Sequence, residues 1–266
     1  MLRQLPGFLE SAYRGYNRQL PKPIETNVRF TVYLFAERGQ WEAFTDQFAG
    51  SASSIYRQIK AGAYYLKGSC VAYNIGRERT FSALAHEGWH QFNNRHFKFR
   101  LPSWLDEGIA MLFEQHRYAD GLFYFEPGRN LYRLGELRKT IEGGHMIPLK
   151  ELTAMNPGEV LDASEPEGVS AFYSQAYALV RFLREDGYGK RLEAYHRLLL
   201  DGLRGAWPLG ETGGRIAADR NIPLTAQWNR LVGPRLLEYY ISNDFEHLEQ
   251  EYKRFCGKIV YHVRFK

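Results

Sequence analysis

Two histidines four residues apart lie inside a stretch that has the apolar spacing of a helix. The stretch covers Phe81–Asn93, and Thr80 is placed to cap its first turn. His86 and His90 would share one helix face, so both imidazoles can reach one ion, and Glu87 stands beside the first of them. Neutral imidazoles hold zinc, and a neighbouring carboxylate can take a proton from the water that the metal activates. The pattern therefore predicts a catalytic zinc site on this helix.

Stretches with strand character precede the histidine helix. Residues 28–35 have the β-branched and aromatic content of a strand. Residues 63–66 and 70–74 read as two further short strands, and the Lys67-Gly68 pair between them predicts a hairpin. Residues 1–20 are expected to be helical. We therefore expect a small mixed sheet in the front part of the chain.

Helices are expected to dominate the rest of the sequence. Pro102-Ser103 is typical of a helix start and predicts a second helix over residues 104–115. Farther along, the apolar pattern has a helical period, most clearly over residues 171–185, 190–200 and 224–240. A β-rich front and a helical back are typical of an α+β protein.

Length and composition favour one globular domain. A chain of 266 residues with 44% hydrophobic residues can bury a substantial core. We expect a single domain over 1–266, with a sheet-bearing sub-lobe at about 1–95 and a mainly helical sub-lobe at 96–266. The net charge is +5, but the basic residues are spread along the chain, so no nucleic-acid partner is expected.

The compartment is less constrained by the sequence. No stretch has the length of a membrane span or of a signal peptide, so we expect a soluble chain, while export and oligomeric state stay open. Cys70 and Cys256 are the only two cysteines, and the sequence does not decide whether they form a disulfide.

A catalytic zinc site needs a third protein ligand, and the sequence offers two. His96 follows His86 by ten residues, which is the metzincin spacing, with Asn93 where that family has the glycine at which the helix turns. Asn is the next most tolerant residue for such a left-handed turn. Glu107 follows His90 by seventeen residues, near the start of the second predicted helix. Spacing alone leaves both candidates open.

The surroundings of Glu107 favour it over His96. Residues 104–110, Trp-Leu-Asp-Glu-Gly-Ile-Ala, resemble the W-L-x-E-G-x-A segment of gluzincin metallopeptidases of the peptidase MA-like and aminopeptidase branches. The resemblance implies a zincin-like metallopeptidase fold with Glu107 as the third ligand. It also implies that the Glu114 carboxylate supports a zinc-binding histidine, a role that we weigh equally with that of a solvated helix carboxylate. Under this interpretation His96 lies in a loop beyond the histidine helix.

Two further segments bear on the reaction. Residues 172–180 resemble the gluzincin segment Y-x-x-[GSA]-x-x-L/V, which implies that Tyr173, with Tyr177 as a substitute, donates a hydrogen bond to the oxyanion. Residues 68–74 are our candidate for an edge strand on which an extended peptide could lie. They lack the G-x-M-E-N segment with which aminopeptidases hold a free amino end, which favours an endopeptidase.

The sequence thus predicts a zinc-dependent peptide hydrolase, with a peptide or protein substrate and Glu87 as general base. Three alternatives stay open. One is a zinc-containing protein that binds a peptide or cell-wall fragment without turnover, and another is a metzincin-type protease that uses His96. The third is a basic interaction module in which the histidine motif is accidental.

Overall fold

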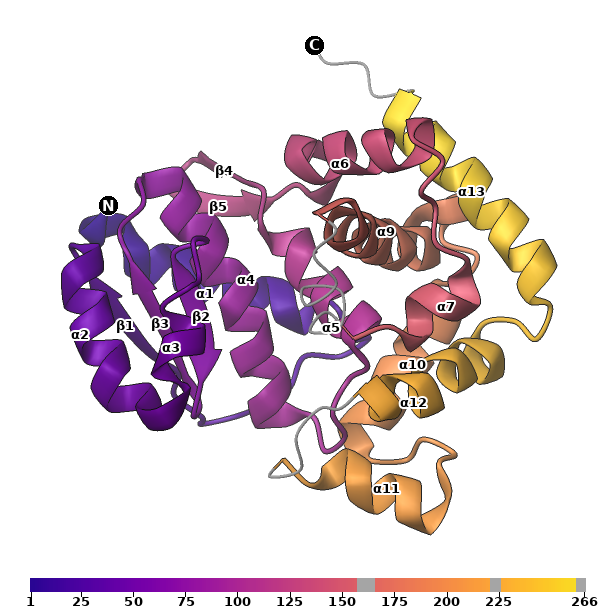
Figure 1. The fold of residues 1–266 in the computed structure, drawn as a ribbon, viewed down its shortest axis with the longest axis horizontal. Coiled ribbons are helices and arrows are strands. Elements are labelled where there is room, and N and C mark those ends of the chain that lie inside the picture. Colours follow the sequence, from indigo (N-terminus) through magenta and orange to yellow (C-terminus); the bar gives the residue numbers. More distant parts are fainter. Residues whose placement is uncertain (157–165, 221–225, 262–266) are drawn as a thin grey trace. The chain divides into compact units, whose positions relative to one another are not determined.

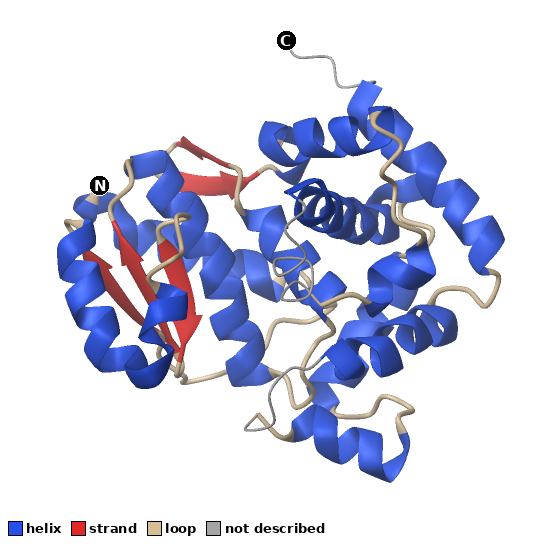
Figure 2. Ribbon diagram, viewed as in Figure 1, coloured by secondary structure: helices blue, strands red, loops and turns tan. Residues whose placement is uncertain are grey.

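Strands occur early in the chain and helices throughout it. The computed structural model describes residues 1–156, 166–220 and 226–261. Within these ranges the last strand ends at Phe125, and the elements that follow are helical (Figure 2). The protein therefore belongs to the mixed helix-and-sheet class that the sequence predicts.

The chain divides into two compact units. The first comprises Met1–His96 and Ala110–Pro127, and the second comprises Phe97–Ile109 and Gly128–Lys266. The first unit thus takes in a segment beyond the expected sub-lobe of about 1–95. No helix of the described residues is both long and apolar enough to cross a membrane.

A three-stranded sheet lies at the centre of the first unit. Its strands are β1 (Thr31–Phe35), β2 (Ala63–Leu66) and β3 (Ser69–Tyr73), in the order β1-β3-β2. β3 runs parallel to β1 and antiparallel to β2. The predicted hairpin is present, with Lys67 and Gly68 at φ values of 49° and 79°. Such left-handed values are typical of a two-residue turn.

The prediction of an edge strand at residues 68–74 is wrong. β3 is hydrogen-bonded on both sides, and all five of its residues are buried. The sequence predicts the hairpin and an earlier strand over residues 28–35, but not that the two pair. In the structure β1, from that earlier segment, pairs with β3 through partners such as Thr31 and Ser69. β2 and β1 are the edges of this sheet.

Helices cover both faces of the sheet. Val71 and Tyr73 of β3 pack against Trp41 of α2 (Arg38–Ala49). The opposite face of the sheet is covered by α4 (Arg77–His96), against which β2 and β3 pack (Figure 1). α1 (Leu5–Asn17) packs in turn on α4, and α3 (Ser53–Tyr56) packs on α2. The helix that carries the histidine motif is therefore enclosed between the sheet and α1.

A second, smaller sheet was not predicted. β4 (His116–Ala119) and β5 (Leu122–Phe125) form a hairpin, with Asp120 and Gly121 at φ values of 53° and 77°. The hairpin packs on α1 through rings that surround Phe8, whose centroid lies 5.0 Å from that of Phe123. The helix predicted over 104–115 is correspondingly shorter: α5 covers Ser103–Ala110, and the 3-10 turn η3 covers Met111–Phe113.

The start of α4 also differs from the prediction. The helix begins at Arg77, and the Thr80 hydroxyl accepts a hydrogen bond from the backbone N–H of Ile75 at 3.0 Å. Thr80 is thus already inside the helix, and it fixes the segment that leads into the first turn instead of capping residue 81.

The second unit is helical around α9 (Pro166–Glu185). Its apolar residues Ala176, Leu179, Val180 and Leu183 are all fully buried. Besides α5, which belongs to this unit except for its last residue, the other described α-helices of the unit are α6 (Leu131–Glu142), α7 (Leu149–Ala154), α10 (Leu192–Arg204), α11 (Gly210–Ala218), α12 (Ala226–Tyr240) and α13 (Phe245–Tyr261). Further 3-10 turns along the chain are η1 (Leu2–Gln4), η2 (Gly50–Ala52), η4 (Pro127–Arg129) and η5 (Asp186–Tyr188).

The helices predicted in this unit are present with shifted ends. Residues 171–185 belong to α9, which already begins at Pro166, and residues 192–200 belong to α10. Of the helix predicted over 224–240, residues 226–240 form α12, and residues 224–225 lie outside the described residues.

Candidate metal centre

The helix α4 presents the two histidines on one side. Its apolar residues Phe81, Leu84 and Trp89 are buried, whereas His86 and His90 are only partly buried. The two imidazole centroids lie 5.0 Å apart. The four-residue spacing therefore places both rings on one helix face, as the sequence predicts.

Two buried side chains anchor α4 to its own unit. The amide of Gln91 donates to the backbone carbonyls of Thr31 at 3.0 Å and Gly68 at 2.8 Å, and so connects the helix to β1 and to the turn before β3. The hydroxyl of Tyr16 donates to the carbonyl of Ala85 at 2.6 Å, directly before the first histidine. The histidine turn is thus fixed from the sheet and from α1.

Gly88, inside the motif, makes room for Tyr16. A Cβ atom at position 88 would lie 2.4 Å from the Tyr16 hydroxyl oxygen. Burial, followed by the nearby Cys70 and Glu87, raises the pKa of Tyr16 well above its usual value, so Tyr16 remains a neutral donor. The glycine is therefore a packing requirement of this turn.

Glu114 contacts the first histidine. Its Oε1 lies 3.1 Å from Nδ1 of His86, and both side chains are largely buried. A carboxylate at this nitrogen orients the imidazole and leaves Nε2 as the nitrogen that faces a metal. Glu114 is therefore in contact with His86 and is not a solvated helix carboxylate.

Glu107 projects from α5, a helix held by two contacts within its own unit. The backbone N–H of Ser103, at the helix start, donates to Oδ1 of the fully buried Asn229 at 2.8 Å. At Gly108 the helix touches α9 so closely that a Cβ atom would lie 2.6 Å from the carbonyl oxygen of Ala176. An eight-residue helix has little stability of its own, so these contacts determine where Glu107 lies.

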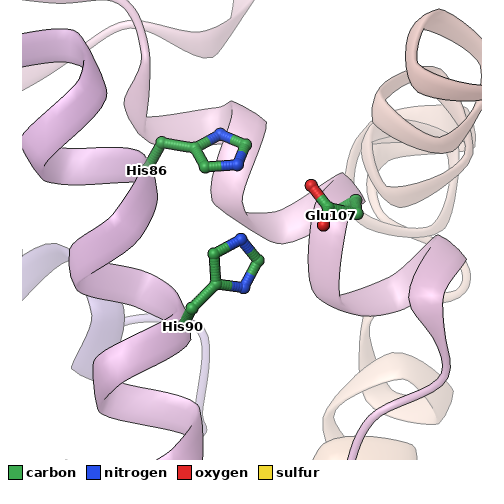
Figure 3. Close-up of side chains that lie close together, drawn as sticks. All are labelled: His86, His90 and Glu107. Atoms are coloured by element: carbon green, nitrogen blue, oxygen red, sulfur yellow. The ribbon is translucent and has the colours of Figure 1, made fainter. Parts of the chain in front are cut away.

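His86, His90 and Glu107 form a group that could hold a metal ion. One ligand atom from each lies within 4.8 Å of the other two. The two imidazoles and the carboxylate point toward one another (Figure 3). Two imidazoles and one carboxylate are a ligand set of catalytic zinc sites, and they leave a fourth position for water or substrate. The residues therefore fit zinc in donor chemistry and in number.

Tyr173 lies on α9, the helix that α5 touches at Gly108. Its ring meets Phe172 edge-on at 5.3 Å, and the guanidinium of Arg133 lies 5.6 Å from its centroid. Tyr177 is fully buried, and its hydroxyl accepts a hydrogen bond from Arg181 at 3.1 Å. Because burial keeps the Tyr177 hydroxyl from any substrate, the substitute role considered for it is wrong.

The structure places His96 differently from the prediction. It is the last residue of α4, not part of a loop, and its ring packs against Phe92 at 4.7 Å and Phe30 at 5.9 Å. Asn93 lies within the helix and is not among the residues with positive φ. The turn that a metzincin-type site requires at Asn93 is therefore missing, and His96 faces an aromatic cluster.

The two cysteines are free thiols. Cys70 lies on β3 and Cys256 on α13, and both are buried. Burial raises the pKa of Cys70 well above its usual value, and Glu87 raises it further. Burial also raises the pKa of Cys256 to about 12. Both thiols therefore stay protonated at neutral pH, and neither is suited to act as a nucleophile.

Several supporting residues have no signal in the sequence. Gln91, Tyr16 and Asn229 act through partners 23 to 126 residues away. For Glu114, by contrast, the gluzincin resemblance implies support of a zinc-binding histidine, and the residue contacts His86. Compared with models of known protein families and with curated protein sequences, the chain matches none.

Replacing Glu114 with Gln is expected to weaken zinc binding by about 10- to 100-fold. The substitution keeps the size of the side chain but removes the charge that makes the His86 imidazole a better ligand. Competition with a chromophoric zinc chelator measures the affinity. Glu126→Gln, which removes a carboxylate paired with Arg117 in the same unit, is the control and should leave the affinity unchanged. Equal affinities for all three proteins would contradict the role of Glu114.

We expect His96 to lower the free energy of unfolding as the pH falls. Burial lowers the pKa of His96 in the folded state. The unfolded chain, with an ordinary pKa of about 6.5, therefore binds the proton more readily, and stability is lost as the pH falls below that value. Urea unfolding with a chelator present, at pH 7.5 and 5.5, should show that His96→Phe loses less stability on acidification than the parent. Identical losses would show that His96 is not responsible.

Proposed function

We propose that the protein is a zinc-dependent peptide hydrolase of the gluzincin type, with a zincin-like arrangement around α4 and α5. The observation that carries the proposal is the group of His86, His90 and Glu107, whose ligand atoms lie within 4.8 Å of one another. Glu87 beside the first histidine, and Glu114 in contact with it, complete the set that such a reaction needs.

In this proposal the three side chains hold one zinc ion, which supplies the Lewis acid that makes water nucleophilic near neutral pH. Glu87 accepts a proton as the water oxygen bonds to the peptide carbonyl carbon. It then delivers that proton to the amide nitrogen as the C–N bond breaks. Glu114 keeps Nε2 of His86 directed at the metal, and the Tyr173 hydroxyl donates a hydrogen bond to the carbonyl oxygen as it becomes an oxyanion.

Peptides blocked at both ends test the proposal, because an endopeptidase does not need a free terminus. The zinc-loaded protein should cleave members of a blocked peptide library, lose the activity to a chelator and regain it with added zinc. Peptides that bind but stay intact would support a non-catalytic zinc protein instead. A protein without tightly held metal, which binds anionic polymers in a salt-sensitive way, would support the basic interaction module.

A further inference from the structure

The guanidinium of Arg133 lies close to two tyrosine rings in the second unit. Its guanidinium carbon is 5.1 Å from the ring centroid of Tyr132 and 5.6 Å from that of Tyr173. Both separations are within the range of a cation–π interaction. The backbone N–H of Arg133 donates to the side chain of Asn130, the N-cap of α6, at 3.2 Å. The backbone of Arg133 is thus held in place by the N-cap of α6.

The packing of α6 on α9 sets how Arg133 meets Tyr173. Seven residues after Arg133, the buried Thr140 hydroxyl lies 3.5 Å from that of Ser174, the neighbour of Tyr173. At Glu136, which lies between Arg133 and Thr140 on α6, the side-chain carboxylate accepts a hydrogen bond from the Ser170 hydroxyl of α9. These contacts hold the two helices together along the turns that follow the arginine, so the stacking is part of a fixed interface.

The nearest carboxylate on the helix of Arg133, that of Glu136, has partners of its own. Glu136 follows one turn later, and the hydrogen bonds from Ser170 and then Lys139 lower its pKa, with a smaller contribution from Arg133. The negative charge of Glu136 is therefore shared among these partners. A guanidinium over the face of a phenol stabilises negative charge on that phenol and makes its O–H a stronger hydrogen-bond donor.

We infer that Arg133 is a positioning residue for Tyr173, which holds the ring in place and strengthens its hydroxyl as a donor. The contact between Arg133 and Tyr173 lies within the second unit. Its use in catalysis rests on the proposed function, in which Tyr173 donates to the oxyanion.

The effect on the phenol is measured directly by NMR of protein labelled with ¹³Cζ-tyrosine, in which Tyr173→Phe identifies the Tyr173 resonance. Arg133→Met, which keeps the aliphatic stem, should raise the pKa of Tyr173 by about half a unit. Arg133→Lys keeps the charge and should give a smaller rise. Arg138→Met is the matched control, because Arg138 is on the same helix but stacks on Tyr261. An unchanged pKa in Arg133→Met would overturn the inference.

A kinetic cycle tests whether catalysis uses the effect. Arg133→Met should lower kcat by about 3-fold in the parent and not at all in Tyr173→Phe, where the phenol that it acts on is missing. Equal losses in both backgrounds would overturn the positioning role. If Tyr173→Phe itself kept full kcat, the proposed mechanism would be wrong, and the NMR result would still decide the inference about Arg133.

Discussion

Replacing Glu87 with Gln is expected to lower kcat for peptide hydrolysis by about 10²- to 10⁴-fold and to leave the zinc content unchanged. Gln has nearly the same size as Glu but cannot accept the proton of the attacking water. Glu87 is not in the group of ligand atoms formed by His86, His90 and Glu107, so the metal should stay bound. The measurement is kcat with a blocked peptide, together with zinc per chain for the same preparation.

The matched control for this experiment is Glu78→Gln. Glu78 is in the first turn of α4 and is 63% exposed in its side chain, so the same substitution on the same helix should leave kcat unchanged. A Glu87→Gln protein that hydrolyses the peptide as fast as the parent would rule out Glu87 as the general base.

A methyl group at position 108 is expected to destabilise the protein, whereas the same group at position 135 should stabilise it. The new Cβ of Gly108→Ala would lie 2.5 Å from Val180 Cγ2 and 2.6 Å from the Ala176 carbonyl oxygen. Because the second of these atoms belongs to the backbone of α9, the helices must move apart, at a cost of about 1–3 kcal/mol. That movement also shifts Glu107, so zinc should bind more weakly.

Gly135 on α6 offers open space, because a Cβ atom added there would have no neighbour within 4 Å. Alanine at this position also restricts the unfolded chain, which should raise the free energy of unfolding by about 0.4–1 kcal/mol. Urea unfolding measures the change in the free energy of unfolding of each variant. We expect a decrease for Gly108→Ala and an increase for Gly135→Ala. Two variants with equal stability would show that α5 does not pack on α9 as closely as the structure has it.

Features that depend on spacing within one element could be predicted from the sequence. The four-residue interval places His86 and His90 on one face of α4. Glu114 lies beyond the end of α5, and its contact with His86 was expected from the gluzincin resemblance, not from spacing. The two short strand-like stretches around Lys67-Gly68 likewise predicted the hairpin, and the helical period predicted most helices.

Features that depend on contacts between distant segments could not be predicted. The pairing of β1 with β3 makes β3 a central strand, and no local pattern reveals strand order. The contact of Ser103 with Asn229 joins residues 126 positions apart. By contrast, the second hairpin has a local signal in Asp120-Gly121, within a stretch of residues 116–125 for which no element was predicted.

Elemental analysis of zinc per chain in the parent and in Glu107→Ala tests the central claim most directly. The account predicts about one zinc per chain in the parent and a large loss in the variant, because two imidazoles alone hold zinc poorly. Circular dichroism of both proteins shows whether the variant is folded. A folded Glu107→Ala protein that keeps its zinc, or a parent that binds none after reconstitution, would contradict the account.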